Sequence, residues 1–240
     1  MRNAWWIARR ELGSYLRSPV GYVIIAAVLA IDGLLFNVAV GGTERRSGEV
    51  LELFFYGTSG TTLVASIFIA MRLIAEERQN GTLVLLLTSP IREVELVLGK
   101  FIAAVVFLGA MTLATFYMPG LVLIHGKVSV AHIVAGYLGL MLLGSAAIAI
   151  GLLCSALAPT QLSAAILGAA SVSAFVLLWL LSRIASPPLE DVLAYLSLHD
   201  KHFRPFMRGL VSIQDVVFYL SLTYVALLAA TRAIEARRWS

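Results

Sequence analysis

Charged residues are scarce in this sequence. Asp, Glu, Lys and Arg together make up only 13% of the 240 residues, whereas 60% are hydrophobic. A soluble domain typically carries about 25% charged residues. A chain this apolar cannot hide its side chains in one aqueous core, so we predict that lipid is its main solvent. The net charge of +4 is modest, and the basic residues stand beside apolar runs, which favours a membrane surface over nucleic acid as a partner.

Two kinds of chemistry are also missing. Cys154 is the only cysteine and lies in an apolar run, so no disulfide can form within the chain. No phosphate-binding loop of the form G-x-x-x-x-G-K-[ST] is present, because Gly99-Lys100 is followed by Phe101 and lacks the earlier glycine. We therefore expect any ATP to be bound by another chain. The first 19 residues lack the apolar core of a signal peptide, so we expect them to be retained.

Long apolar runs are abundant instead. A helix needs about 20 mainly apolar residues to cross the roughly 30 Å hydrocarbon layer. Six runs reach that length, which predicts an all-α membrane protein with a single domain over residues 1–240. The predicted spans are Pro19–Val40, Phe54–Ile74, Lys100–Ile124, Ala131–Ala158, Gln161–Ser182 and Ile213–Ile234.

The basic residues predict an orientation. Eleven of the 18 Lys and Arg residues lie in the N-terminal segment, in the connection between the second and third spans, or at the C-terminus. The positive-inside rule then places both termini and that connection in the cytoplasm.

The connection between the second and third spans has its own helix signals. Ser89-Pro90 predicts a helix that starts near Pro90, as Ser18-Pro19 does for the first span. The second span is expected to project beyond the bilayer as far as Glu76 and Glu77, and Asn80-Gly81 should stop it. Thr82 could then cap a short helix over Leu83–Leu87. Two interpretations remain open: a hairpin that dips its leucines into the headgroups, or a transverse helix on which a cytoplasmic protein docks.

Met71–Lys100, MRLIAEERQNGTLVLLLTSPIREVELVLGK, resembles the signature region of type-2 ABC transporter permeases. Val84 departs from that pattern, which often has glutamate there. The resemblance extends to Ser18–Tyr22, to Gly136–Gln161 and to Tyr195–Tyr219; the last stretch is similar to the gliding-motility-associated ABC permease subgroup.

The resemblance implies a layout around the six spans. Residues 1–18 would form an amphipathic connecting helix, residues 79–90 a cytoplasmic coupling helix, and residues 183–212 short helices in the outer leaflet. Trp5, Trp6, Ile7, Leu12 and Leu16 would then face lipid or protein. The connecting-helix residues expected to face water and the ATPase are Arg9, Arg10 and Glu11. The coupling residues implied are Glu76, Glu77, Gly81, Thr82, Leu86, Leu87 and Pro90.

The implied function is that of a membrane-spanning permease subunit of an export-type ABC transporter, in the bacterial inner membrane. The chain itself would hold no cofactor and would not be an enzyme, since ATP and Mg would sit on two copies of a separate ATP-binding subunit. A second permease chain, identical or related, and membrane lipid complete the expected partners. The alternative is a scaffold that transmits ATPase strokes to an extracytoplasmic accessory protein without conducting a substrate. A polar lining along the first, second and fifth spans would favour transport, and an apolar lining would favour the scaffold or lipid handling.

A few polar residues within or beside the spans need separate treatment. Asp32 is an acid inside a span, so it should face a cavity or partner, with Asn37 nearby on a possible translocation path. Alternatively, the span is shifted and Asp32 lies near the outer headgroups. His199 and His202 have a spacing too weak to indicate a metal site, and Gly136, Gly139 and Gly144 are interpreted as close helix packing.

Overall fold

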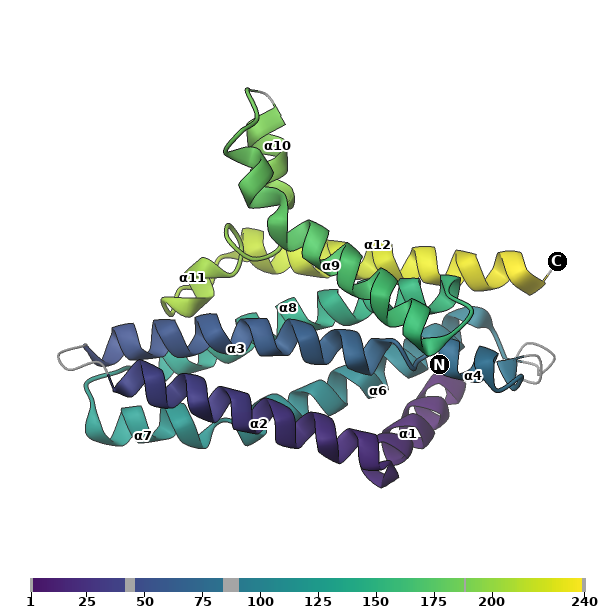
Figure 1. The fold of residues 1–240 in the computed structure, drawn as a ribbon, viewed down its shortest axis with the longest axis horizontal. Coiled ribbons are helices and arrows are strands. Elements are labelled where there is room, and N and C mark those ends of the chain that lie inside the picture. Colours follow the sequence, from purple (N-terminus) through teal and green to yellow (C-terminus); the bar gives the residue numbers. More distant parts are fainter. Residues whose placement is uncertain (1, 42–45, 84–90, 188, 239–240) are drawn as a thin grey trace.

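The computed structural model describes residues 2–41, 46–83, 91–187 and 189–238. These residues are almost entirely helical and contain no strand. Six helical stretches are long and apolar enough to cross a membrane, and they run roughly along one axis (Figure 1). The predicted all-α architecture with six spans is therefore confirmed.

The first and fifth spans agree with the prediction to the residue. They are α2 (Pro19–Val40) and α9 (Gln161–Ser182). The second comprises α3 (Ser47–Ala70) and, after a turn, α4 (Ala75–Gln79); the third comprises α6 (Glu93–Ala114) and α7 (Tyr117–His125). The remaining helices are α1 (Arg2–Arg17), α8 (Val130–Leu157), α10 (Leu189–Leu196), α11 (Arg204–Met207) and α12 (Ile213–Arg238).

Figure 1 shows α1, α4 and the last turns of α12 toward one end of the bundle, and α7 and α11 toward the other. We call these the terminal end and the distal end. With six spans, the two termini must lie on the same side of a membrane, and both ends of the chain are drawn toward the terminal end.

Helix α8 is the centre of the bundle. It packs against α3, α6, α9 and α12. In its most apolar stretch 72% of the residues are buried, whereas the corresponding share is 17% in α2 and in α9. Glycines permit the close contacts: a Cβ on Gly136 would lie 2.3 Å from the Phe55 ring, and one on Gly139 would lie 2.5 Å from Phe206 Cβ. The packing interpretation of these glycines is confirmed.

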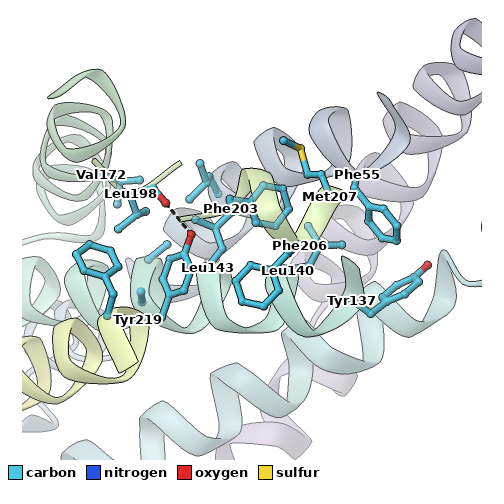
Figure 2. Close-up of a cluster of buried hydrophobic side chains, with 14 of the residues drawn as sticks. Phe55, Tyr137, Leu140, Leu143, Val172, Leu198, Phe203, Phe206, Met207 and Tyr219 are labelled. Atoms are coloured by element: carbon cyan, nitrogen blue, oxygen red, sulfur yellow. Dashed lines mark hydrogen bonds between the residues drawn. The ribbon is translucent and has the colours of Figure 1, made fainter. Parts of the chain in front are cut away.

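The core of the distal half is aromatic (Figure 2). Phe55, Phe203, Phe206 and Tyr219 are completely buried there. The Tyr219 hydroxyl donates a hydrogen bond to the Leu198 carbonyl oxygen at 2.7 Å, which ties the segment before α11 to α12. An unpaired phenol would be costly in such surroundings, and this bond removes the cost.

The segment between α9 and α12 differs from its prediction in one respect. Short helices were expected on or in the outer leaflet, and α10 has no buried residue. However, Phe203, Phe206 and Met207, which were included in that expectation, are buried among α3, α8 and α12 rather than at a lipid surface. The small residues of α8 leave room for their rings, so this part of the segment belongs to the core.

Local signals explain most helix ends. The Ser18 hydroxyl accepts a hydrogen bond from the Val20 amide and Pro19 opens α2, as predicted. Pro119 cannot donate a backbone bond and its ring would clash with the carbonyl of Thr115, so the third span breaks at Thr115–Phe116. Pro90, near which a helix start was predicted, lies outside the described residues; α6 begins three residues later, at Glu93, after Arg92 in an extended conformation.

Candidate functional site

A buried ionic cluster occupies the terminal end of the bundle. Lys100 Nζ lies 2.7 Å from Glu11 Oε1 and 2.8 Å from Glu77 Oε1. Arg10 Nη2 lies 3.3 Å from the same Glu77 oxygen. Two cations and two carboxylates balance, so the cluster is neutral as a whole. Its members come from α1, α4 and α6, and it therefore joins the N-terminal helix to both sides of the connection at residues 80–92.

The burial of this cluster makes its geometry important. The Lys100 side chain is only 1% exposed, and those of Glu11 and Glu77 are 16% and 12% exposed. Isolated charges at such positions would cost several kcal/mol each, and close pairing offsets that cost. Glu77 Oε2 is buried without a hydrogen-bond partner among the described residues. The cluster consequently tolerates little displacement of α4 relative to α1 and α6.

Gly99 allows α1 to come close enough for these pairs. A Cβ at this position would lie 2.7 Å from the Ala4 carbonyl oxygen and 2.9 Å from the Ile7 side chain. Ala4, Ile7 and Ala8 form the buried face of α1. Gly99 and Lys100 thus act together: the first admits α1, and the second binds its carboxylate.

Tyr15 fixes the other end of α1. Its hydroxyl donates to the Ile69 carbonyl oxygen at 3.0 Å, and its ring stacks on Phe107 with centroids 4.9 Å apart. Burial, and secondarily the charge of Glu11, raises the pKa of Tyr15, so the phenol stays a neutral donor. Helix α1 is therefore anchored to α3 as well as to α6.

Helix α4 is separated from α3 by a turn at residues 71–74, and Ser155 of α8 supports that turn. The Ser155 hydroxyl donates to the Met71 carbonyl oxygen at 3.1 Å and accepts from the amides of Ile74 and Ala75 at 3.1 and 2.9 Å. Arg78 also donates to the Ala158 carbonyl oxygen at 2.9 Å. The second span thus extends past Glu76 and Glu77 to Gln79, as expected, but with a turn at residues 71–74 whose backbone groups bind α8.

The structure brings together part of the predicted coupling set. Glu77 belongs to the ionic cluster, whereas Glu76 pairs with Arg72 one turn earlier, at 2.9 Å. Gly81 has a positive φ of 73°, which stops the helix as expected, and the Thr82 hydroxyl donates to the Glu77 carbonyl oxygen. Leu86, Leu87 and Pro90, and with them most of the predicted coupling helix, lie outside the described residues.

One expectation for α1 needs correction. Glu11 was expected to face water, but it faces Lys100, because the neighbouring Gly99 places α1 against α6. Of the residues expected to face lipid or protein, Ile7 is buried, while Trp5 and Trp6 remain 65% and 59% exposed. Arg9 and Arg10 are exposed as expected. Lys100, Ser155 and Tyr15 were missed as site residues; the adjacent Gly99 was the available signal for Lys100.

The two residues proposed for a translocation path are not on one face. Asp32 is completely buried between α2 and α3, where it meets Thr61. Asn37 is exposed five residues later, on another side of the helix. Asp32 is thus covered by protein rather than turned toward headgroups.

The histidines at the distal end have separate partners. His199 Nε2 lies 2.7 Å from Ser59 Oγ, and His202 Nδ1 lies 2.6 Å from Asp215 Oδ1. His202 is completely buried and stacks on Phe218. The two rings therefore hold the distal segment to α3 and α12 and do not converge on a shared ligand position.

Comparison with known proteins identifies the family to which the chain belongs. The sequence profile of the ABC-2 family transporter proteins matches residues 5–236. The chain belongs to the ABC-2 transporter family. A probable ABC transporter permease protein, NosY, from Pseudomonas aeruginosa is 32% identical over 121 residues, which cover 48% of this chain and 44% of that protein. The match thus spans less than half of the curated relative. Within this ABC-2 protein, the ionic cluster is the candidate functional site.

Proposed function

We propose that this ABC-2 protein is the membrane-spanning subunit of an ATP-driven transporter, and that a separate ATP-binding subunit acts on its terminal end. The observation that carries the proposal is the Lys100–Glu11–Glu77 cluster. It links the helices on both sides of residues 80–92 to α1 through buried, charge-assisted contacts. A push on this connection would move α1, α4 and α6 together.

The proposed ATPase contact has two parts. Residues 79–90, with Leu86 and Leu87, would dock in an apolar groove of the ATP-binding subunit, and Arg9 with Arg10 would face it from α1. Glu76 is one-third exposed beside Arg72 and remains accessible to a basic partner residue, whereas Glu77 is engaged within the chain. Two copies of that subunit would hold ATP and Mg, and this chain would hold neither.

The orientation and assembly follow the same proposal. The terminal end, with both termini, would face the cytoplasm of a bacterium, since 11 of the 18 basic residues belong to it. Two membrane halves are needed, so a second permease chain would complete the transporter. An impermeant thiol reagent added outside intact cells should fail to label Ser240→Cys in a Cys154→Ala background; labelling would reverse the topology.

The exposed faces of the spans bear on the substrate. Apart from Tyr22 and Asn37, the exposed residues of α2 are apolar. The same holds for α3 apart from Glu49 and Tyr56, and for α9 apart from Ser173. An apolar lining favours a lipid-like substrate, or transmission of force to an extracytoplasmic accessory protein without conduction. The resemblance of Tyr195–Tyr219 to gliding-motility-associated permeases supports the second candidate. A structure of the complete complex would decide between them by the presence or absence of a continuous path between two chains.

The central experiment is a double substitution, Leu86→Asp with Leu87→Asp. Buried carboxylates in an apolar groove are costly, so the variant should lose the ATP-binding subunit that co-purifies with the wild-type chain, or uncouple its ATP turnover from transport. The matched control is Leu210→Asp with Val211→Asp, two exposed apolar residues at the distal end, which should retain both. Full retention of the subunit, turnover and transport by the Leu86/Leu87 variant would contradict the docking proposal and favour the headgroup-dipping hairpin.

A further inference from the structure

Asp32 forms a polar contact deep inside the bundle that the proposed coupling does not use. It lies 13 residues after Pro19 in a 22-residue helix, which places it about 20 Å along a helix of about 33 Å. The side chain is completely buried. Its Oδ1 atom lies 2.7 Å from Thr61 Oγ1 of α3. The contact joins the two helices near the middle of the span.

The hydrogen atoms at this contact can be counted. The Thr61 hydroxyl carries one proton, yet its oxygen lies 2.7 Å from Asp32 Oδ1 and 2.9 Å from the Thr58 carbonyl oxygen. With an ionised carboxylate, both neighbours are acceptors, so only one of these contacts is a hydrogen bond. If Oδ1 carries a proton, the acid donates to Thr61 and Thr61 donates to Thr58. Both contacts are then satisfied, and 2.7 Å is an ordinary distance for a neutral O–H···O bond.

Hydroxyl groups of α3 lie beside Asp32, but no cation offsets a negative charge there among the described residues. Within residues 2–41, 46–83, 91–187 and 189–238, no basic side chain forms an ion pair with Asp32. The ionisable group within electrostatic reach is Tyr137 of α8, whose hydroxyl lies 2.9 Å from Thr115 Oγ1. In the part of the chain that the structure describes, Asp32 Oδ2 is buried without a hydrogen-bond partner. An unpaired carboxylate oxygen in such a place is far more costly than the same oxygen of a neutral acid.

A second hydroxyl completes the site. Thr58 is buried one helical turn before Thr61, and its Oγ1 atom also has no partner among the described residues. The three-residue spacing places both threonines on the same face of α3. The Thr58 hydroxyl is thus available to donate a hydrogen bond to the Asp32 carboxylate once the acid has lost its proton.

We propose that Asp32 and Thr61 form a proton-binding site in the membrane interior, with the proton held on Asp32 in the packed state of α2 and α3. Separation of the two helices would admit water, in which an aspartic acid ionises with a pKa of about 3.9. The proton would leave to water as the helices part and return as they close. Each chain would thus release and rebind one proton each time α2 and α3 separate and close again. Higher pH should therefore favour the separated state.

Infrared spectroscopy of the full chain in lipid nanodiscs tests the site directly. At neutral pH the wild type should show the C=O stretching band of a protonated carboxylic acid, and Asp32→Asn should lose it. Asp200→Asn is the matched control, because the Asp200 side chain is 39% exposed and paired with Arg204, and it should leave the band unchanged. Absence of the band in the wild type, or its persistence in Asp32→Asn, would overturn the proposal.

Two further measurements keep the test independent of how well Asp32→Asn folds. Thr61→Val retains the acid but removes its partner, so the band should shift to higher frequency; an unshifted band would contradict the pairing. Replacing KCl with NaCl should leave the wild-type band intact. Loss of the band in sodium would show that the carboxylate holds a metal cation, which also overturns a proton as the occupant.

Discussion

Lys100 and Glu11 are 89 residues apart in the sequence and only 2.7 Å apart in the structure. The pair is almost completely shielded from water on the lysine side. It connects a helix outside the six spans to the start of the third span, and Glu77 extends the connection to α4. The ion pairs thus join α1, α4 and α6 at the terminal end of the bundle.

Lys100→Met should destabilise the protein strongly. The substitution leaves Glu11 and Glu77 buried without their shared cation, which typically costs about 3–5 kcal/mol. Thermal unfolding in nanodiscs would measure the loss. Lys127→Met, at an exposed position, is the control and should change little. Adding Glu11→Gln and Glu77→Gln to Lys100→Met should restore much of the stability; no restoration would mean that lost packing, not unpaired charge, causes the effect.

Gly99→Ala should displace α1 from α6. The new methyl group would lie 2.7 Å from a backbone oxygen of α1, which cannot rotate away. Overpacking of this kind costs about 1–3 kcal/mol, and proteolysis within α1 should become faster. Gly60→Ala introduces a methyl group into open space on α3 and should leave both properties unchanged. Equal behaviour of the two variants would mean that α1 is not held against Gly99.

Hydrogen exchange should divide the segment between α9 and α12 into two parts. Residues 198–207 include Leu198, His202, Phe203 and Phe206, all completely buried, so their amides should exchange slowly. Helix α10 has no buried residue and should exchange faster. His202→Ala leaves Asp215 without its partner and should accelerate exchange in residues 198–207 while leaving α10 unchanged. Uniform exchange along the whole segment would contradict this division.

His199 should make stability depend on pH. Burial lowers the pKa of His199 below its ordinary value, and the nearby Arg204 acts in the same direction, while Asp200 opposes it. The unfolded chain therefore binds the proton more readily, so the contribution of His199 to stability is complete above the unfolded pKa of about 6.5 and declines as pH falls below it. His199→Gln should show a weaker decline on the acid side than the wild type. Parallel unfolding curves for the two proteins across that range would rule out His199 as the source.

Run length and composition were sufficient to predict the six spans, because lipid imposes a minimum length on each helix. The helix start at Ser18-Pro19 and the helix stop at Gly81 were also predictable from short-range signals. The candidate functional site was harder to predict from the sequence. Counting basic residues treats Lys100 as a surface charge, and only the approach of α1 across Gly99 turns it into a buried centre. The turn before α4 was missed for a similar reason, since Ser155 lies about 80 residues away along the chain.

The ionic cluster also constrains how the chain is made. Helix α1 leaves the ribosome early, but Glu11 has no buried cation to bind until Lys100 has been synthesised and the third span has entered the membrane. Until then, we expect α1 to lie on the bilayer surface, where its exposed tryptophans can bind the headgroup region. Docking of α1 therefore cannot be completed before the third span has entered the membrane. Under the proposed function, the terminal end would be ready for an ATP-binding subunit only after that step.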